Sequence, residues 1–506
     1  MATQTTIPGA RPEHRGLAYW MERVLKEREK LQTSPDPDTV HDLRVAIRRC
    51  RSVGAVMEEV DPDPAWTEMR KLGRKLFRQL GGLRDTQVLE EWTKQFSAEA
   101  DPVRQRLLDV FEKRESELRE ASLRVAAKFD QKAWIRLERA LRRRSRLVPP
   151  EGLAAQCLAL ERLEAARELH IHAMRTEKAK PWHELRIGVK RFRYTVESLL
   201  PARYEQWGEN LKRVQDLLGE VHDFDVLVDT IAQVAADAPE DSRSAWAAKL
   251  ETERHERIEK YRQLTLGKTS LWQEWRQGLP QGEALEEAAL SRLRVTARAM
   301  DSNARRTGLV SRLAMRLFDA LRRVHASAVF EMPDTRKIMR AASRIHGIGA
   351  ALDSSPPQKA ARQFLRDMAL PAGWSTEEWE LLATVVRYHR GVQPKPKHKA
   401  FAKLTEMDQK RVAVIAGALR LARVLRKCGV ESTVGLRVER SVDALIVTLP
   451  GLLGTEEAAA RLAAGKYLLE TCLELPLILK AAPAINKILE LPNKLEVVQS
   501  TAVASD

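Results

Sequence analysis

The chain has 506 residues, which exceeds what one hydrophobic core supports and predicts about two to four domains. Lysine and arginine number 86 against 70 acidic residues, so the net charge of +16 would attract an anionic partner: a nucleic acid, an anionic membrane or polyphosphate. The four cysteines are scattered, which excludes a disulfide framework and a zinc ribbon; without a signal peptide or a long apolar run, we expect a cytoplasmic protein with no membrane span.

Residues rich in Leu, Ala, Arg and Glu predict helices throughout the N-terminal half. A helix that carries His41 is expected to begin at a capping box of Thr39 and Asp42 and to end before Asp61. A linker at 148–152 precedes further helices over about residues 154–277. The other helices of the first half are predicted over about residues 15–33, 65–80, 85–97 and 102–147.

Two motifs recur in the same order and at nearly the same spacing. HDLRVAIRRCRS at 41–52 matches HELRIGVKRFRY at 183–194. Downstream, GGLRD ending at Asp85 matches GEVHD ending at Asp223. Two ordered matches indicate an internal duplication. We predict one repeat over about residues 13–147 and another over about 153–279.

Each motif predicts an amphipathic helix whose polar face is wholly basic. At 100° per residue the first basic stripe contains His41, Arg44, Arg48 and Arg51, opposite Leu43, Ala46, Ile47 and Cys50. The second contains His183, Arg186, Lys190 and Arg193, opposite Leu185, Gly188, Val189 and Phe192. Arg49 and Arg191 lie at the flanks. A further basic helix face follows in each repeat, with Arg74, Lys75 and Arg78 in the first and Lys212 and Arg213 in the second, where Asp216 replaces the last cation.

A stripe of one charge sign is costly without a partner. Like charges at i,i+4 destabilise a helix by about 0.2–0.5 kcal/mol per pair, and solvated faces normally mix both signs. Two such stripes, each about 15 Å long, favour an extended polyanion over a single small phosphate. A solvated surface or a set of structural ion pairs remains the alternative. His41 and His183, which recur at one motif position, are expected to titrate near neutrality.

The pattern H-x-L-R-[VI]-x-x-[RK]-R-x-R, followed by L-G-x-x-x-D, resembles the CHAD family over about residues 13–279. This resemblance implies two pseudo-symmetric helical bundles around a basic channel that binds inorganic polyphosphate. The resemblance also implies a set of phosphate-binding candidates: His41, Arg44, Arg48, Arg49, Arg51, His183, Arg186, Lys190, Arg191 and Arg193.

The C-terminal third, about residues 286–500, reads as a second helical domain after a boundary at 279–282. Alternating residues at 432–450 predict a small β-hairpin. Residues 367–391, with RIHGIG before and IAGALRLARVL after, resemble the C-terminal HD-like domain of the exopolyphosphatase and guanosine-pentaphosphate phosphatase family. Secondary anion-binding candidates here are Arg387, His389 and Arg390.

Metal-dependent hydrolysis is disfavoured in this domain. The resemblance implies a His-Asp pair and a later Asp as metal ligands, but Gly347 follows His346 and Arg423 replaces the later Asp. We therefore predict a polyphosphate-binding protein of all-α fold, without metal or cofactor and without enzymatic activity, that could attach to polyphosphate granules. Nucleic-acid binding and weak phosphohydrolase activity are the alternatives.

Overall fold

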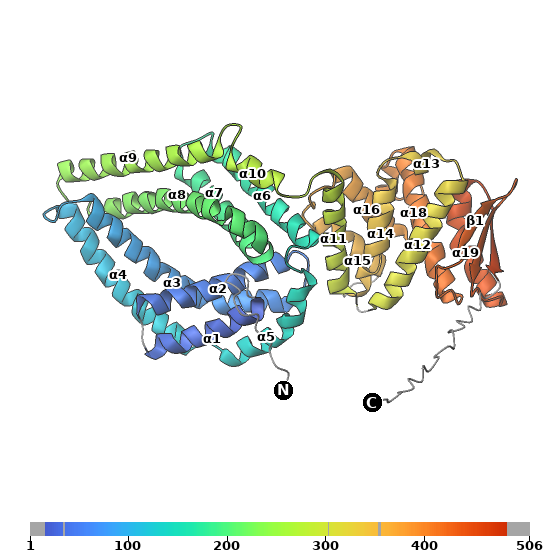
Figure 1. The fold of residues 1–506 in the computed structure, drawn as a ribbon, viewed down its shortest axis with the longest axis horizontal. Coiled ribbons are helices and arrows are strands. Elements are labelled where there is room, and N and C mark those ends of the chain that lie inside the picture. Colours follow the sequence, from blue (N-terminus) through green and yellow to red (C-terminus); the bar gives the residue numbers. More distant parts are fainter. Residues whose placement is uncertain (1–15, 34–35, 302, 353–355, 483–506) are drawn as a thin grey trace, which may run out of the picture. The chain divides into compact units, whose positions relative to one another are not determined.

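The computed structural model describes residues 16–33, 36–301, 303–352 and 356–482. Two compact units divide the chain: the first takes residues up to 304 together with 340–383, and the second takes 305–339 together with residues from 384 onward. Helices dominate both units, which confirms the predicted all-α class (Figure 1). Within the described ranges, every helix falls short of the length and apolarity that a bilayer-crossing segment needs.

The two repeats of the first unit correspond helix by helix. The first repeat runs α1 (Leu17–Thr33), α2 (Pro37–Met57), α3 (Pro64–Phe96), α4 (Pro102–Ala127) and α5 (Gln131–Arg144), then a 3-10 turn (Ser145–Leu147). The second runs α6 (Leu153–Ala173), α7 (Ala179–Leu199), α8 (Pro201–Val234), α9 (Glu240–Thr265) and α10 (Leu271–Gln277). The motif helices α2 and α7 hold the same place in each set, and a long helix follows each of them (Figure 1).

Three helix boundaries differ from the prediction. Helix α2 begins earlier, because Asp36 rather than Thr39 is the N-cap and accepts a hydrogen bond from the Thr39 amide at 2.8 Å. Helix α3 continues through Gly81 and Gly82, where a break was expected; a Cβ at position 82 would lie 3.3 Å from Leu118 of α4, so glycine here permits close helix packing. The predicted helix over 102–147 is broken by the cap residue Asp130.

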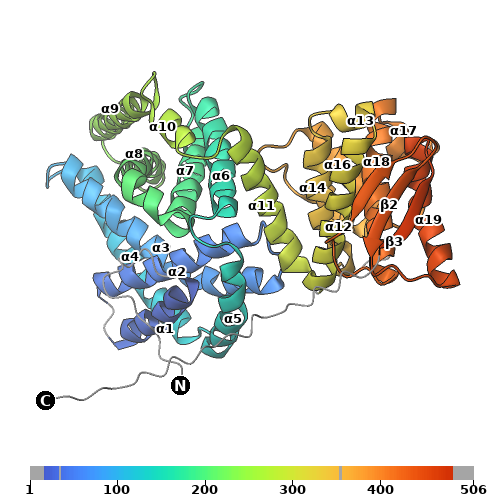
Figure 2. The same cartoon turned by 45° about the vertical axis from the view of Figure 1, so that its right-hand side comes forward.

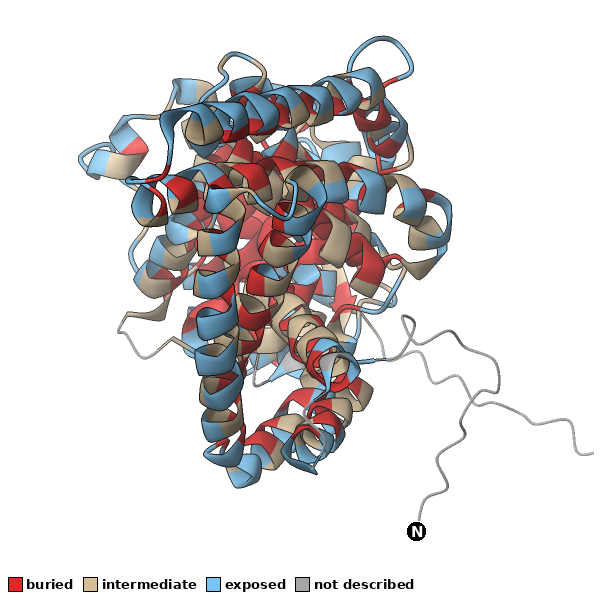
Figure 3. Cartoon of the chain, turned by 90° about the vertical axis from the view of Figure 1, so that its left-hand side faces the viewer, coloured by how far each residue is buried: buried red, intermediate tan, exposed pale blue. Residues whose placement is uncertain are grey.

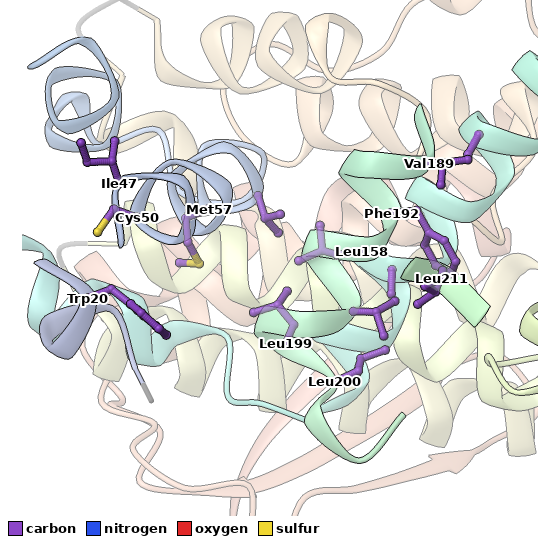
Figure 4. Packing of buried hydrophobic residues seen from close by; sticks show 14 of the residues in the cluster. Trp20, Ile47, Cys50, Met57, Leu158, Val189, Phe192, Leu199, Leu200 and Leu211 are labelled. Atoms are coloured by element: carbon purple, nitrogen blue, oxygen red, sulfur yellow. The ribbon is translucent and has the colours of Figure 1, made fainter. Parts of the chain in front are cut away.

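One hydrophobic core is shared by both repeats. It joins Trp20 and Ile47 of the first repeat to Leu158, Phe192 and Leu211 of the second in a continuous cluster (Figure 4). In Figure 3 the buried positions of the first unit's helices turn inward and the exposed positions turn outward. The apolar residues predicted to oppose the basic stripes are buried, so both motif helices have the predicted orientation.

A buried ion pair links the two motif helices inside this core. Arg49 of α2 donates a hydrogen bond to Glu197 of α7, and these residues are only 8% and 4% exposed. The Arg49 guanidinium also lies 5.2 Å from the centre of the Trp20 ring. Burial of an unpaired charge is strongly unfavourable. The pair therefore favours the arrangement in which α2 and α7 pack together in the core.

After α10, the chain continues as α11 (Gly282–Met300), which packs on α6, where Arg292 meets Glu161 at 3.1 Å. The remaining helices are α12 (Ala304–Val324), α13 (Ala328–Glu331), α14 (Thr335–Ile345), a 3-10 turn (Ile348–Ala350), α15 (Pro357–Asp367), α16 (Thr376–Tyr388), α17 (Lys399–Ala402), α18 (Glu406–Lys427) and α19 (Glu456–Leu473).

The second unit contains a small sheet of order β1-β2-β3 among its described residues (Figure 2). Strands β1 (Arg437–Arg440) and β2 (Leu445–Pro450) form the predicted antiparallel hairpin, with Arg437 opposite Thr448. Strand β3 (Leu477–Ala482) pairs in parallel with β2 after the α19 crossover. The third strand was not predicted, because its short apolar run does not distinguish a strand from a helix end.

The Arg49–Glu197 pair gives a stability prediction. Glu197→Gln leaves the Arg49 charge buried without its counter-charge, so we expect a loss of about 3–5 kcal/mol in the free energy of unfolding of the first unit. Denaturant unfolding followed by tryptophan fluorescence measures it. The control is Glu68→Gln, which removes an exposed ion pair with Arg136 and should cost no more than about 1 kcal/mol. Equal losses in the two variants would show that the buried pair is not a structural link.

Candidate anion-binding site

The two basic stripes lie on helices that pack against each other, and they face the same region. The guanidinium of Arg48 on α2 lies 4.9 Å from the ring centre of Tyr194 on α7. Arg44 of the first stripe is close enough to Lys190 of the second to lower the pKa of its ammonium group. His41 and His183, which are 142 positions apart in the sequence, thus belong to two stripes that the fold brings together.

An arginine pocket of about 400 Å³ lies at one end of the stripes. It contains Arg48 and Arg51 from α2, and its other lining residues are Ser52, Ala55, Val56, Arg70, Phe77, Arg162, Arg191, Tyr194 and Thr195. Arg51 donates to the backbone carbonyl of Arg70 at 2.6 Å and lies over Phe77. Two of these arginines have acidic partners: Glu58 pairs with Arg70, and Glu59 with Arg162. No other ion pair involves these five arginines in the described part of the chain.

At the centre of the stripes, the cations are packed closely enough to perturb one another. Burial, followed by repulsion from Arg186 and Arg44, lowers the pKa of Lys190 to about 7. Burial also lowers the pKa of Arg44, although Asp85 lies 3.6 Å from it. The matching carboxyl of the second repeat, Asp223, has its pKa raised to about 6 by burial. Two carboxyls therefore face the three cations Arg44, Arg186 and Lys190, and protonation of Asp223 near pH 6 reduces this neutralisation further.

The histidine of the second stripe lies beside another histidine. His183 lies 3.2 Å, Nδ1 to Nδ1, from His222 on α8. Burial and then Arg186 lower the pKa values of both rings, that of His222 to about 4. Both shifts favour the neutral form of the rings, and His183 makes a hydrogen-bonding contact with His222. His41 is exposed, and its predicted role stays a prediction.

The fold places the other predicted residues in different surroundings. Arg49 is turned into the core toward Glu197 and does not join the stripe. Arg193 is half-buried and donates to the Tyr204 hydroxyl at 3.2 Å, while Arg191 lines the arginine pocket. Arg74 lies close to Arg51. Burial has the largest lowering effect on the pKa of Arg51, followed by the charge of Arg70 and then that of Arg74. Lys75, Arg78, Lys212 and Arg213 are exposed on α3 and α8.

Sequence reasoning missed the contribution of α6 and underrated that of His222. Arg162 lies outside both motifs, so nothing in the local pattern marks it as part of the arginine pocket. His222 occupies the place in GEVHD that Arg84 occupies in GGLRD, and this alignment gives no sign that its ring contacts His183. In the second repeat, Asp216 lies beside Arg193 and Lys190, which makes that side less basic than the first.

In the C-terminal part, the secondary candidates separate into two kinds. His389 is 1% exposed and bonds through Nδ1 to the Val386 carbonyl at 2.6 Å, so it is a core histidine. His346 is likewise buried and bonds to the Ser343 carbonyl. Arg387 and Arg390 are half-buried near other arginines. Among the described residues, no group of three or more His, Cys, Asp or Glu side chains is arranged to hold a metal ion.

The first unit is thus a duplicated helical domain with two convergent basic faces. Residues 16–232 match the family model of the CHAD domain, and residues 293–447 match that of Ppx/GppA phosphatase, domain III. Both resemblances inferred from the motifs are confirmed. The crystal structure of the CHAD domain from the plant Ricinus communis is 20% identical, with 55% of this chain and 96% of that chain covered at a TM-score of 0.35. No curated protein matches the chain.

The crowded cations make a prediction about protonation. Lys190 should titrate near pH 7 in an NMR titration of the lysine side chains, and Arg186→Gln should move its pKa upward because it removes the largest repulsion. Since an anion favours the charged ammonium, affinity for an anion should rise as pH falls through 7, and rise further as Asp223 is protonated near 6. The control Arg139→Gln, on the exposed surface of α5, should leave the titration unchanged. An ordinary lysine pKa for Lys190 would contradict the crowded arrangement.

Proposed function

We propose that the first unit binds inorganic polyphosphate through the basic stripes of α2 and α7, as its match to the CHAD domain implies. The observation that supports this most strongly is the convergence of two wholly basic helix faces on one region, with Arg48 over Tyr194 and Arg44 close to Lys190. Such an arrangement is unfavourable for the free protein. A ligand with many closely spaced negative charges would relieve it.

The chemistry of the lining residues suits phosphate oxygens. Guanidinium groups can donate two parallel hydrogen bonds to a phosphate, and the arginine pocket contains five of them, of which Arg70 and Arg162 are paired with glutamates. Arg48 has a buried Nε without a hydrogen-bond partner, so a donor is available for a ligand. Each stripe is about 15 Å long, which exceeds the reach of one phosphate group and fits a linear chain.

Nucleic acid fits this surface less well. Proteins that bind single strands without sequence preference present aromatic rings on which bases stack. The rings at the stripes, Tyr194 and Phe77, lie under the guanidinium groups of Arg48 and Arg51. A guanidinium thus covers one face of each ring, and the surface offers much charge with little area for stacking.

We further propose that the protein binds polyphosphate without hydrolysing it. The match to Ppx/GppA phosphatase, domain III, relates the C-terminal part to phosphatases, but Gly347 and Arg423 occupy positions where the family resemblance implies metal-binding carboxylates. A binding protein of this kind could attach to polyphosphate granules in the cytoplasm.

Charge reversal of the first stripe tests the proposal. Arg44→Glu with Arg48→Glu removes two phosphate contacts and adds repulsion, so polyphosphate affinity should fall by about a hundredfold or more, as expected for the loss of two charge-assisted contacts. The melting temperature should hold, because reversing these half-buried arginines relieves repulsion within the site. Titration with size-defined polyphosphate at fixed salt measures the affinity.

The matched control reverses Arg139 and Arg143, two exposed arginines at the same i,i+4 spacing on α5. An equal loss of affinity in this control would mean that net charge, rather than the stripes, determines binding. DNA and RNA should fail to displace bound polyphosphate; displacement would favour the nucleic-acid alternative. Release of phosphate on addition of Mn²⁺ or Mg²⁺ would favour the hydrolase alternative.

A further inference from the structure

A second cavity of the first unit, of about 710 Å³, adjoins the arginine pocket. Its lining comes from the segment between α2 and α3, from α6 and α11, and from α15 with the segment that follows it. Helices α6 and α11 pack side by side, as Figure 2 shows. Arg162 of α6 lines both cavities, so the two share a wall. A volume of this size is usual for a site that binds an organic ligand.

The lining of this second cavity is acidic, although the chain as a whole carries a net charge of +16. Two arginines line it, Arg162 and Arg292, together with six acidic residues: Glu58, Glu59, Asp61, Glu161, Glu164 and Glu168. We call this cavity the glutamate pocket. Glu168 is exposed and forms no ion pair in the described part of the chain. The pocket therefore favours a ligand that carries positive charge, in contrast to its neighbour.

Another part of the lining is apolar. Leu370 is 45% exposed, and Met368 nearby in the sequence is half-buried. Their segment is held against α6, because the Ala372 amide donates a hydrogen bond to Oε1 of Glu161 at 3.1 Å. An apolar surface beside carboxylates suits a ligand that joins apolar groups to cationic ones, as lysine-containing chains do.

The glutamate pocket also contains a buried donor that lacks an acceptor. Arg292 is only 3% exposed, and its Nε lies 3.1 Å from Oε2 of Glu161. Its Nη1 is buried without a hydrogen-bond partner. A buried donor left in this state is unfavourable, so a ligand that brings an acceptor to Arg292 gains a hydrogen bond that the free protein lacks. A ligand made only of ammonium groups and methylenes has no such acceptor.

The wall between the two pockets is made of ion pairs that reach into both. Glu58 and Glu59 line the glutamate pocket, whereas their partners Arg70 and Arg162 line the arginine pocket. A cation on one side and an anion on the other would therefore compete for opposite members of the same pairs. Whichever ligand binds first releases the charges that the other one needs, so the two ligands should strengthen each other's binding.

We propose that the glutamate pocket binds a basic, apolar peptide segment of a partner protein, and that this binding raises the affinity of the arginine pocket for polyphosphate. Lysine side chains of the segment would meet the carboxylates, and its apolar side chains would pack on Leu370. A main-chain carbonyl would accept from Arg292. The peptide site stands by itself, whereas the coupling rests on the proposed polyphosphate binding.

The first experiment titrates the full-length chain with the end-capped pentapeptide Leu-Lys-Leu-Lys-Leu in a calorimeter, without any polyphosphate. We expect binding, and none with Leu-Glu-Leu-Glu-Leu or Ser-Lys-Ser-Lys-Ser, which lack the cations or the apolar side chains. Leu370→Arg places a competing cation on the apolar wall and should weaken binding by about tenfold or more. The control Leu266→Arg adds the same charge at a leucine of similar exposure, 48%, and should bind as the wild type does.

The second experiment tests the coupling with single neutralised acids. Glu59→Gln removes the counter-charge of Arg162, so peptide affinity should fall and polyphosphate affinity should rise, each by about threefold or more. Glu168→Gln should weaken the peptide alone. The control Glu120→Gln, an exposed acid of α4, should change neither affinity. A merely structural disturbance would weaken both ligands, and that result for Glu59→Gln would overturn the coupling.

The outcome for the glutamate pocket is separate from that of the stripe experiment. If the wild type failed to bind the lysine-containing pentapeptide, or if Leu370→Arg and Leu266→Arg lost the same affinity, the peptide site would be wrong whatever the stripes bind. If polyphosphate failed to bind the wild type, the proposed function would be wrong, while the titrations with peptide alone would still decide the site. Should Leu370→Arg not fold, unchanged peptide binding by Glu168→Gln would overturn the proposal.

Discussion

The packing of α2 on α7 determines most of what the first unit can do. Both helices bury their apolar faces in one core, and their basic faces are therefore turned toward the same region. The buried pair of Arg49 with Glu197 adds a polar link that is satisfied only in this arrangement. Duplication alone would give two separate basic stripes; the shared core is what merges them.

The merged site has an electrostatic cost that the core must offset. Lys190, Arg44 and Arg186 crowd together, and the nearby carboxyls Asp85 and Asp223 neutralise them only in part. The pKa shifts record this cost, since the charged form of Lys190 is disfavoured in the free protein. A bound polyanion would favour the charged form of Lys190.

Helical periodicity predicted the orientation of the stripes, because burial of residues such as Leu43 and Ile47 depends only on their spacing along one helix. It could not assign Arg49, whose partner Glu197 lies 148 residues further along the chain. It could not find Arg162, which only the tertiary fold brings to the pocket. Local signals also predicted a helix break at Gly81, where α3 is in fact continuous. Glycine weakens a helix by only about 1 kcal/mol, and packing on α4 outweighs this.

The most direct test of the merged site is to count its ligands. The count should be made with a polyphosphate of defined length in a calorimetric titration. A single shared site predicts one chain bound per protein, and a large loss of affinity when either Arg48 or Arg186 alone is changed to glutamine. Two ligands bound per protein, with each substitution removing one and leaving the other at its original affinity, would show that the two stripes act separately and would contradict the account.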